Sequence, residues 1–338
     1  MPKGSFGIST TGTGRQLVPE AAGDNRNEGE TGLQHYVGRF APSPTGPLHF
    51  GSLVAAAASY LDARANKGSW LVRVENIDPP REAPGAVTAI LRALETYGFE
   101  WQGPVTYQGS NEGRHRAVIA DLIARGLAYP CTCSRSSLAD APAGESGPVY
   151  PGTCRRGCDA GEHAIRLLTN DLPVSFTDGL QGRFEQRLES AVGDFIIRRK
   201  DGLIAYQLAV VVDDFDQGIT DVVRGLDLMD STPRQLHLQR CLDMPQPRYK
   251  HTPLVLSADG QKLSKSSGAK PIPLDRVEPV LIRALASLWQ EPAPELAEAS
   301  LEDVWKWAIE NWDPEKLRAK KQTFQAPETI ANKQNRLS

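Results

Sequence analysis

A turn rich in proline and glycine, residues 42–47, lies between a predicted strand and a predicted helix, and the start of this helix could bind a phosphate. Residues 36–41 predict a strand, and the apolar residues 51–65 predict a helix that begins at Gly51. Backbone N–H groups at a helix start bind anions, because they lack intrahelical partners and carry the positive end of the helix dipole. Gly51 lets a nucleotide approach the backbone, and His49 could donate to a phosphate oxygen. A single histidine at such a place is more often structural, so both interpretations stay open here.

A second candidate for phosphate binding is the sequence KLSKS at residues 262–266. It follows a predicted strand at 253–257 and a turn that contains Gly260. Lys262 and Lys265 would place cations where negative charge develops when pyrophosphate leaves. A solvated surface turn is at least as good an interpretation of this pentapeptide taken alone.

In order and spacing, these two segments resemble the HIGH and KMSKS motifs of class I aminoacyl-tRNA synthetases. The longer run RFAPSPTGPLHFGS, residues 39–52, resembles the glutamyl branch of that class, which accepts Ser52 at the fourth HIGH position. Leu263 replaces the methionine of KMSKS and conserves volume. The resemblance implies that ATP with Mg²⁺ is a substrate and that His49 and Lys265 are catalytic. The ATP-binding residues that it implies are His49, Gly51, Ser52, Lys262 and Lys265.

The residues 73–81, RVENIDPPR, follow the predicted strand 70–75 and resemble the RIEDTD stretch of glutamyl-tRNA synthetases. Ligands of open α/β sheets bind at the carboxyl ends of strands. The resemblance implies that Glu75 binds the α-ammonium of L-glutamate and that Tyr206 and Arg224 also contact it. A guanidinium fork matches a carboxylate, so Arg39 is a further candidate for the side-chain carboxylate. The full glutamate-binding set is Arg39, Phe40, Ala41, Pro42, Ser43, Glu75, Tyr206 and Arg224.

These pocket residues also have ordinary explanations. Glu75 could be a solvated strand end, Tyr206 a core aromatic and Arg224 a member of a surface ion pair. Residues 204–212 predict a buried strand that ends at Asp213 and Asp214. For this carboxylate pair we favour a structural role over acid/base chemistry or Mg²⁺ binding.

Four of the five cysteines fall between residues 131 and 158, in a segment without regular hydrophobic periodicity. The N-terminus shows no secretory signal, so metal binding is favoured over disulfides. Cys131, Cys133, Cys154 and Cys158 predict a Cys₄ zinc site from chemistry alone. Reduced thiols without a metal are the alternative, and Cys241 is interpreted as a core residue.

The spacing Cys-x-Cys followed by Tyr-x₃-Cys resembles glutamyl-queuosine tRNA(Asp) synthetases, which are truncated paralogues of glutamyl-tRNA synthetase. This resemblance implies the zinc ligands Cys131, Cys133, Tyr150 and Cys154, with one structural Zn²⁺ per chain. It covers residues 36–329. The 72 residues after Ser266 are too few for the anticodon-binding domain of a full glutamyl-tRNA synthetase.

The expected fold class is α/β, a Rossmann-like class I aminoacyl-tRNA synthetase core with a zinc-containing insertion, a helical C-terminal region and no anticodon-binding domain. Strand, crossover helix and strand in succession predict a parallel sheet. The expected organisation is a disordered tail at 1–34, the first half of the catalytic domain at 35–129, the zinc-binding part of the insertion at 130–161, the rest of the insertion and the second catalytic half at 162–271, a helical region at 272–330 and a tail at 331–338.

Composition excludes few classes of function. The 338 residues are 40% hydrophobic and 23% charged, with a formal net charge of −3, so an RNA contact must be a local basic surface. Candidates for it are Arg155, Arg156, Arg198, Arg199, Lys200 and the run 316–321. No apolar run approaches the length of a membrane span, and we expect a cytoplasmic monomer that does not bind membranes.

The family resemblance implies ATP-dependent activation of glutamate and its transfer to the queuosine base at the wobble position of tRNA(Asp). Three rival functions stay open. The first is a shortened glutamyl-tRNA synthetase that charges a 3′ end. The second is a small-molecule ligase or nucleotidyltransferase, and the third is a non-catalytic RNA-binding paralogue.

Overall fold

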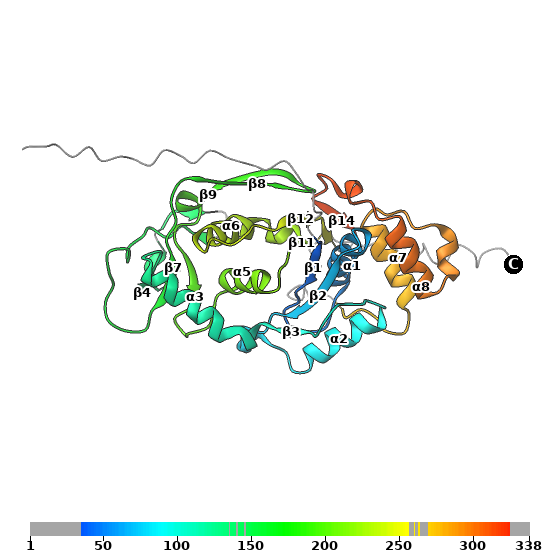
Figure 1. The fold of residues 1–338 in the computed structure, drawn as a ribbon, viewed down its shortest axis with the longest axis horizontal. Coiled ribbons are helices and arrows are strands. Elements are labelled where there is room, and N and C mark those ends of the chain that lie inside the picture. Colours follow the sequence, from blue (N-terminus) through cyan, green and yellow to red (C-terminus); the bar gives the residue numbers. More distant parts are fainter. Residues whose placement is uncertain are drawn as a thin grey trace, which may run out of the picture. The chain divides into compact units, whose positions relative to one another are not determined.

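The computed structural model describes residues 35–134, 136–139, 141–144, 147–256, 260, 263 and 270–324 (Figure 1). The predicted tails at 1–34 and 331–338 lie outside these residues. So do Lys262 and Lys265. In the described part of the chain, no helix combines the length and apolar character needed to cross a membrane.

Parallel strands form the centre of the fold, in two groups that lie side by side (Figure 1). The first group has the order β1-β2-β3, and the second pairs β11 with β12. The strands are β1 (Val37–Phe40), β2 (Ser69–Val74), β3 (Thr106–Tyr107), β11 (Asp221–Gly225) and β12 (Arg248–Thr252). In register, Val37 pairs with Ser69 and Asp221 pairs with Arg248.

The two groups meet at β1 and β11. The N–H of Thr220 donates to the carbonyl of Val37 at 3.0 Å, and the N–H of Val37 donates to Thr220 Oγ1 at 2.8 Å. From β1 the chain leads to β2 on one side of this junction, and from β11 it leads to β12 on the other side. Connections that diverge in this way leave a crevice at the carboxyl ends of the strands, which is where open α/β sheets bind ligands.

Helix α1 (Phe50–Ala65) supplies much of the main core. It is buried along most of its length, and small alanines alternate with larger side chains such as Leu53 and Leu61, both fully buried. It packs against β1, β2 and β11 and against the C-terminal helices α7 (Val277–Ser287) and α8 (Leu301–Glu310). Helix α2 (Ala86–Thr96) follows β2, and β13 (Leu254–Leu256) pairs in parallel with β14 (Gln322–Phe324).

The insertion between β3 and β11 builds a second core of its own (Figure 1). Its antiparallel sheet has the order β10-β7-β4, and β8 pairs with β9 in a separate hairpin. The elements are α3 (Glu112–Ala124), β4 (Ala128–Cys131), β5 (Ala143–Gly144), β6 (Gly147–Pro148), β7 (Ala164–Leu167), β8 (Pro173–Asp178), β9 (Gly182–Arg187), α4 (Leu188–Ala191), β10 (Phe195–Arg198) and α5 (Tyr206–Asp216). Helix α6 (Thr232–Cys241) follows β11.

One predicted element is wrong. Residues 204–212 were expected as a buried strand, but residues from Tyr206 onward form helix α5. The side chains from Leu208 to Asp214 are all buried, so the helix shows no polar face. A continuous apolar run of this length does not separate a buried strand from a buried helix, and the three consecutive valines favour the strand only by propensity. The strand β14 also interrupts a region expected to be helical.

Candidate active site and metal centre

A cavity of about 680 Å³ opens at the carboxyl ends of β1, β2, β11 and β12. Every glutamate- or nucleotide-binding residue predicted within the described residues lines it. These are Arg39, Phe40, Ala41, Pro42, Ser43, His49, Gly51, Ser52, Glu75, Tyr206 and Arg224. A second cavity of about 690 Å³, which Tyr60, Trp305 and Lys306 help to line, contains none of these residues.

The start of α1 forms one wall of the first cavity. His49 is the N-cap of the helix, and its Nδ1 accepts the N–H of Ser52 at 3.3 Å. A neutral His49 ring therefore carries its proton on Nε2. A Cβ added to Gly51 would lie 3.2 Å from the His49 ring and 3.2 Å from the carbonyl oxygen of Leu263. Glycine thus allows the helix start to approach the segment that contains Leu263.

Leu263 is the one residue of the KLSKS sequence within the described residues. It lines the same cavity as His49, and its N–H donates to the carbonyl of Val255 on β13 at 3.0 Å. The two sequence motifs are therefore adjacent at this point.

Asp214 on α5 binds two arginines from the central sheet. Arg39 Nε and Nη2 donate to its two carboxylate oxygens at 3.1 and 3.3 Å, and Arg73 Nη2 lies 2.7 Å from Oδ1. Burial alone would raise the pKa of Asp214, but the charges of Arg39 and Arg73 and their hydrogen bonds lower it below its ordinary value. Arg39 is 4% exposed and Arg73 is 1% exposed, so the carboxylate compensates two buried cations.

Asp213 has a different set of contacts. It accepts hydrogen bonds from Gln108 Nε2 and Asn111 Nδ2, both at 2.7 Å, and lies 2.8 Å from His115 Nε2. Its hydrogen-bond partners belong to residues 108–115, and Arg73 Nε on β2 lies 4.0 Å from its Oδ2. These contacts and those of Asp214 agree with the structural role favoured for the carboxylate pair.

Glu75 lies at the carboxyl end of β2, 8% exposed, and lines the cavity. Among the described residues, no hydrogen-bond donor reaches its Oε1. Burial raises the pKa of Glu75, although the charges of Arg73 and Arg39 oppose that rise. Arg73 Nη2 lies 3.5 Å from Oε1 as an ion pair, and a ligand ammonium would supply the missing hydrogen-bond donor together with a further positive charge.

Arg224 on β11 is 5% exposed and faces the cavity from the opposite side of the sheet junction. Its Nε donates to His251 Nε2 at 3.1 Å, and its Nη2 donates to Thr232 Oγ1 at 2.9 Å and Gln235 Oε1 at 2.8 Å. Its Nη1 is buried and has no hydrogen-bond partner within the described residues. Tyr206, the first residue of α5, lines the cavity nearby, and burial raises the pKa of its hydroxyl.

The cysteine-rich segment brings three sulfur atoms and one phenol oxygen together. The Sγ atoms of Cys131, Cys133 and Cys154 lie within 4.8 Å of one another, with Cys133 and Cys154 at 3.6 Å. The hydroxyl of Tyr150 lies 3.4 Å from Cys131 Sγ and 3.9 Å from Cys133 Sγ. Sulfur ligands of tetrahedral zinc, with bonds of about 2.3 Å, lie about 3.8 Å apart. The four side chains therefore fit a zinc ion.

Cys158 is not among the three cysteines whose sulfur atoms lie within 4.8 Å of one another, so the geometry favours Tyr150 over Cys158 as the fourth ligand. The N–H of Cys154 donates to the Tyr150 oxygen at 2.9 Å, which favours that oxygen as a ligand. Arg166 donates from Nε to Cys131 Sγ at 3.2 Å, and its Cζ lies 3.7 Å from the centre of the Tyr150 ring. Three thiolates and a phenolate around Zn²⁺ would carry net negative charge, which this guanidinium would offset.

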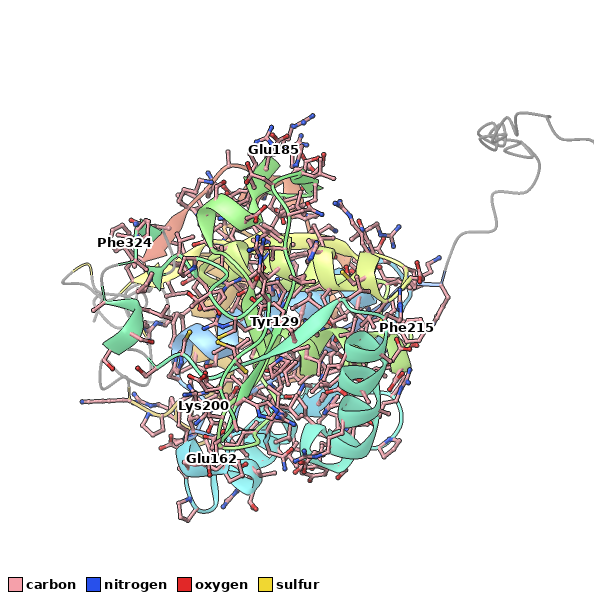
Figure 2. The ribbon with its side chains drawn as sticks, turned by 90° about the vertical axis from the view of Figure 1, so that its left-hand side faces the viewer. Tyr129, Glu162, Glu185, Lys200, Phe215 and Phe324 are labelled. Atoms are coloured by element: carbon pink, nitrogen blue, oxygen red, sulfur yellow. The ribbon has the colours of Figure 1, made fainter. Side chains whose placement is uncertain are left out.

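Figure 2 shows the insertion from the side opposite the C-terminal helices, with Tyr129 near the centre of the view. The Tyr129 hydroxyl donates to Asp194, which also accepts two hydrogen bonds from Arg155 at 2.7 Å. Arg155 also contacts Glu189 at 2.6 Å. This pairing gives Arg155 a structural role and makes it a weaker candidate for RNA contact.

Several residues near the two sites were not assigned a function from the sequence. Arg73, Gln108, Arg166 and His251 were not predicted as functional. Arg73 and Arg166 lie on strands beside predicted ligands, and alternation along the strands could have indicated them. Asp178 contacts His251 from a hairpin that the sequence pattern did not reveal.

Comparison with known proteins agrees with this geometry. The family model described as tRNA synthetases class I (E and Q), catalytic domain, matches residues 36–278. The chain belongs to this class I tRNA synthetase family. It is 57% identical to the Glutamyl-Q tRNA(Asp) synthetase of Ectopseudomonas mendocina (strain ymp) over 82% of this chain and 93% of the relative.

A second relative has the same name. The Glutamyl-Q tRNA(Asp) synthetase of Pseudomonas aeruginosa PAO1 is 54% identical over 83% of this chain and 95% of its own length. Among solved structures, a glutamate tRNA ligase from Elizabethkingia meningosepticum in complex with its amino acid superposes with a TM-score of 0.74. That match has 22% identity and covers 88% of this chain and 68% of the ligase, so it supports the fold of this class I synthetase.

We expect Asp214→Asn to lower the free energy of unfolding by about 3–5 kcal/mol at neutral pH, because it removes the carboxylate paired with buried Arg39 and the nearest of the three carboxylates around buried Arg73. The pKa of Asp214 is lowered in the folded chain, so its stabilisation is complete above the unfolded value of about 3.9 and is lost as the pH falls through the folded value. Urea unfolding of both proteins between pH 7 and pH 3 measures this.

The control for that experiment is Asp216→Asn on the same helix. Asp216 is partly exposed and lies 3.5 Å from Arg114, so its loss should change stability by less than about 1 kcal/mol. Equal effects of the two substitutions would contradict the assigned role of Asp214.

We expect Gly193→Ala to lower the zinc content of the purified chain and to speed zinc release to a chelator. Gly193 has φ of 72° and bridges to Tyr150, and an added Cβ would overlap the Tyr150 backbone and displace its ring. Gly126→Ala is the control, because Gly126 has φ of 68° and no described neighbour lies within 4 Å of a Cβ added there. Both variants bear the strain of a left-handed alanine, about 1–2 kcal/mol. Identical zinc retention in the two variants would show that Tyr150 does not help to hold the metal.

Proposed function

We propose that this chain uses ATP to activate L-glutamate as glutamyl-adenylate and then transfers the glutamyl group to the queuosine base at the wobble position of tRNA(Asp). The observation that carries the proposal is the cavity at the strand ends, in which the helix start after His49 faces a buried carboxylate and a buried guanidinium. The close relatives named Glutamyl-Q tRNA(Asp) synthetase support it.

Glutamate fits the charges on the cavity wall. Glu75 would accept from the α-ammonium, and Arg224 would donate from Nη1 to the side-chain carboxylate. Tyr206 and the backbone of residues 40–43 would complete the contacts. Arg39 shares its charge with Asp214, so it contributes less to the carboxylate than Arg224 does. Glutamine would leave the Arg224 charge uncompensated, and a site built for a charged partner rejects such an analogue.

Activation requires the α-carboxylate oxygen of glutamate to attack the α-phosphorus of ATP, which breaks the bond to pyrophosphate. His49 Nε2–H and the amide groups at the α1 start would donate to phosphate oxygens. Gly51 and Ser52 would allow that close approach, and Lys262 and Lys265 would stabilise the departing pyrophosphate. Mg²⁺, bound with ATP, would offset part of the phosphate charge. In the second step a hydroxyl oxygen of the base attacks the glutamyl carbonyl carbon, and AMP leaves.

Zinc would be held by Cys131, Cys133, Tyr150 and Cys154. It would act as a structural crosslink, because its ligands lie within the insertion and do not line the glutamate cavity. The proposed organisation is a Rossmann-like catalytic domain, with this insertion and the C-terminal helices, that acts as a cytoplasmic monomer.

The RNA contact would use basic side chains near the insertion. Arg199 binds Asp78 at 3.2 Å and Asp201, whereas Lys200, labelled in Figure 2, donates to the carbonyl of Thr132 and is exposed. Arg156 is also exposed. Lys200 and Arg156 are therefore better candidates than Arg155 or Arg199 for contacts to the RNA backbone.

We expect labelled glutamate to be incorporated into tRNA(Asp) that carries queuosine and not into the same tRNA with guanosine at the wobble position. The measurement is acid-precipitable label with purified chain, ATP and each tRNA. Equal labelling of both tRNAs would contradict the proposed acceptor and favour a shortened glutamyl-tRNA synthetase.

The activation step distinguishes the proposed enzyme from a small-molecule ligase and from a non-catalytic paralogue. Pyrophosphate exchange that depends on a different acid would identify a small-molecule ligase. Absence of glutamate-dependent exchange, together with binding of RNA, would identify a non-catalytic paralogue.

A further inference from the structure

The surroundings of Arg224 differ from those of the two arginines on β1 and β2 near the cavity. Arg39 and Arg73 both bind the carboxylate of Asp214. Within the described residues, Arg224 donates only to neutral acceptors: an imidazole nitrogen, a hydroxyl, an amide oxygen and, at 3.4 Å, the carbonyl of Leu228. These hydrogen bonds fix the orientation of the guanidinium, but none of them is accepted by a carboxylate. Within the same residues its Nη1 has no hydrogen-bond partner. Such a group is suited to an anionic ligand.

The imidazole acceptor must have one particular tautomer. Arg224 Nε–H can only donate, so His251 Nε2 must accept and the ring proton must lie on Nδ1. His251 Nδ1 lies 2.6 Å from Asp178 Oδ2, and both side chains are fully buried. A carboxylate on this side holds the proton on Nδ1. The accepting Nε2 requires a neutral ring, and burial lowers the pKa of His251 in the same sense, although the hydrogen bond to Asp178 opposes that change.

The carboxylate of Asp178 belongs to the β8–β9 hairpin and has little freedom to move. Asp178 ends β8, and its Oδ1 accepts three backbone N–H groups, from Leu180 at 3.0 Å, Gln181 at 2.9 Å and His251 at 3.2 Å. Oδ1 is thereby committed to the turn, and Oδ2 is directed at the imidazole. The hairpin is therefore linked to Arg224 in the cavity wall by two consecutive hydrogen bonds, one between Asp178 and His251 and one between His251 and Arg224.

We propose that Asp178 and His251 are positioning residues that act through Arg224 to select a ligand with a side-chain carboxylate. Asp178 fixes the His251 tautomer, and neutral His251 orients the guanidinium without cancelling its charge. A carboxylate placed directly on Arg224 would orient it equally well but would remove the advantage of glutamate over glutamine. This inference rests on the proposed glutamate site and assigns a function to the hairpin that contributes no residue to the cavity lining.

The decisive variant is Asp178→Asn, which changes no volume. Its amide oxygen should remain on the three backbone N–H groups, so its NH₂ group faces His251 Nδ1 and forces the ring proton onto Nε2. Two donors, Nε2–H and Arg224 Nε–H, then oppose each other. We expect the KM for glutamate in ATP–pyrophosphate exchange to rise about 10- to 100-fold, the effect of losing a hydrogen bond to a charged group. The KM for ATP should change less than about threefold.

Two His251 variants extend the test. His251→Leu removes the acceptor and should raise the KM for glutamate as Asp178→Asn does, with a lower kcat/KM ratio of glutamate to glutamine. His251→Gln restores an acceptor and should recover at least part of that ratio. His115→Leu is the matched control, because His115 is also fully buried and 2.8 Å from a carboxylate, that of Asp213, yet does not contact Arg224. It should lower stability without changing the glutamate-to-glutamine ratio.

The outcomes distinguish a failure of the proposed function from a failure of the proposed positioning role. Wild-type chain without glutamate-dependent exchange would overturn the proposed function itself. If the wild-type chain is active and Asp178→Asn changes neither the KM for glutamate nor the discrimination against glutamine, the positioning role alone is overturned. If His251→Leu does not fold, Asp178→Asn and His251→Gln still decide. An equal loss of discrimination in His115→Leu would show general destabilisation in place of positioning.

Discussion

A single buried carboxylate determines how the two parts of the fold meet. Asp214 extends from the insertion helix α5 and binds Arg39 of β1 and Arg73 of β2, so it joins the insertion to the first half of the parallel sheet. Without it, buried Arg39 would lose its carboxylate partner and buried Arg73 would lose the nearest of its three carboxylates, at a cost in stability. With it, α5 is held so that Tyr206, at its first turn, lines the cavity beside Glu75. The position of the proposed glutamate pocket thus follows from an ion pair that does not itself need to contact the ligand.

The arginines around the cavity differ in whether a carboxylate pairs with them, and this difference determines where positive charge remains available to a ligand. Arg39 and Arg73 both bind Asp214, and Arg73 also lies 3.5 Å from Glu75, whereas Arg224 is held by neutral groups, one of which is a histidine oriented by Asp178. Glu75 lies across the cavity, buried and short of a donor. A ligand with an ammonium at one end and a carboxylate at the other would compensate both groups. The start of α1, with His49 as its cap, adds an anion-binding helix end beside them.

Much of this arrangement could be predicted from sequence, for physical reasons. The parallel pairing of β1 with β2 and the start of α1 were recognisable because a strand, a proline-glycine turn and an apolar helix follow one another locally. Helix α5 was mistaken for a strand, since its run of valines is buried on all sides and has no periodicity. The β8–β9 hairpin, the partners of Asp214 and the Asp178–His251 pair depend on contacts between residues far apart in the chain, and no local pattern encodes them. Cysteine count alone suggested Cys158 as a ligand, whereas folding brings the Tyr150 hydroxyl beside Cys131.

The most direct measurement of the central claim is a crystal structure of the chain with a non-hydrolysable glutamyl-adenylate analogue. The side-chain carboxylate of the analogue should lie within hydrogen-bond distance of Arg224 Nη1, its ammonium against Glu75, and its phosphate-mimicking group at the start of α1 between His49 and Leu263. Arg39 and Arg73 should remain bound to Asp214. An analogue bound elsewhere, or one whose carboxylate displaces Asp214 from Arg39 and leaves Arg224 untouched, would contradict it.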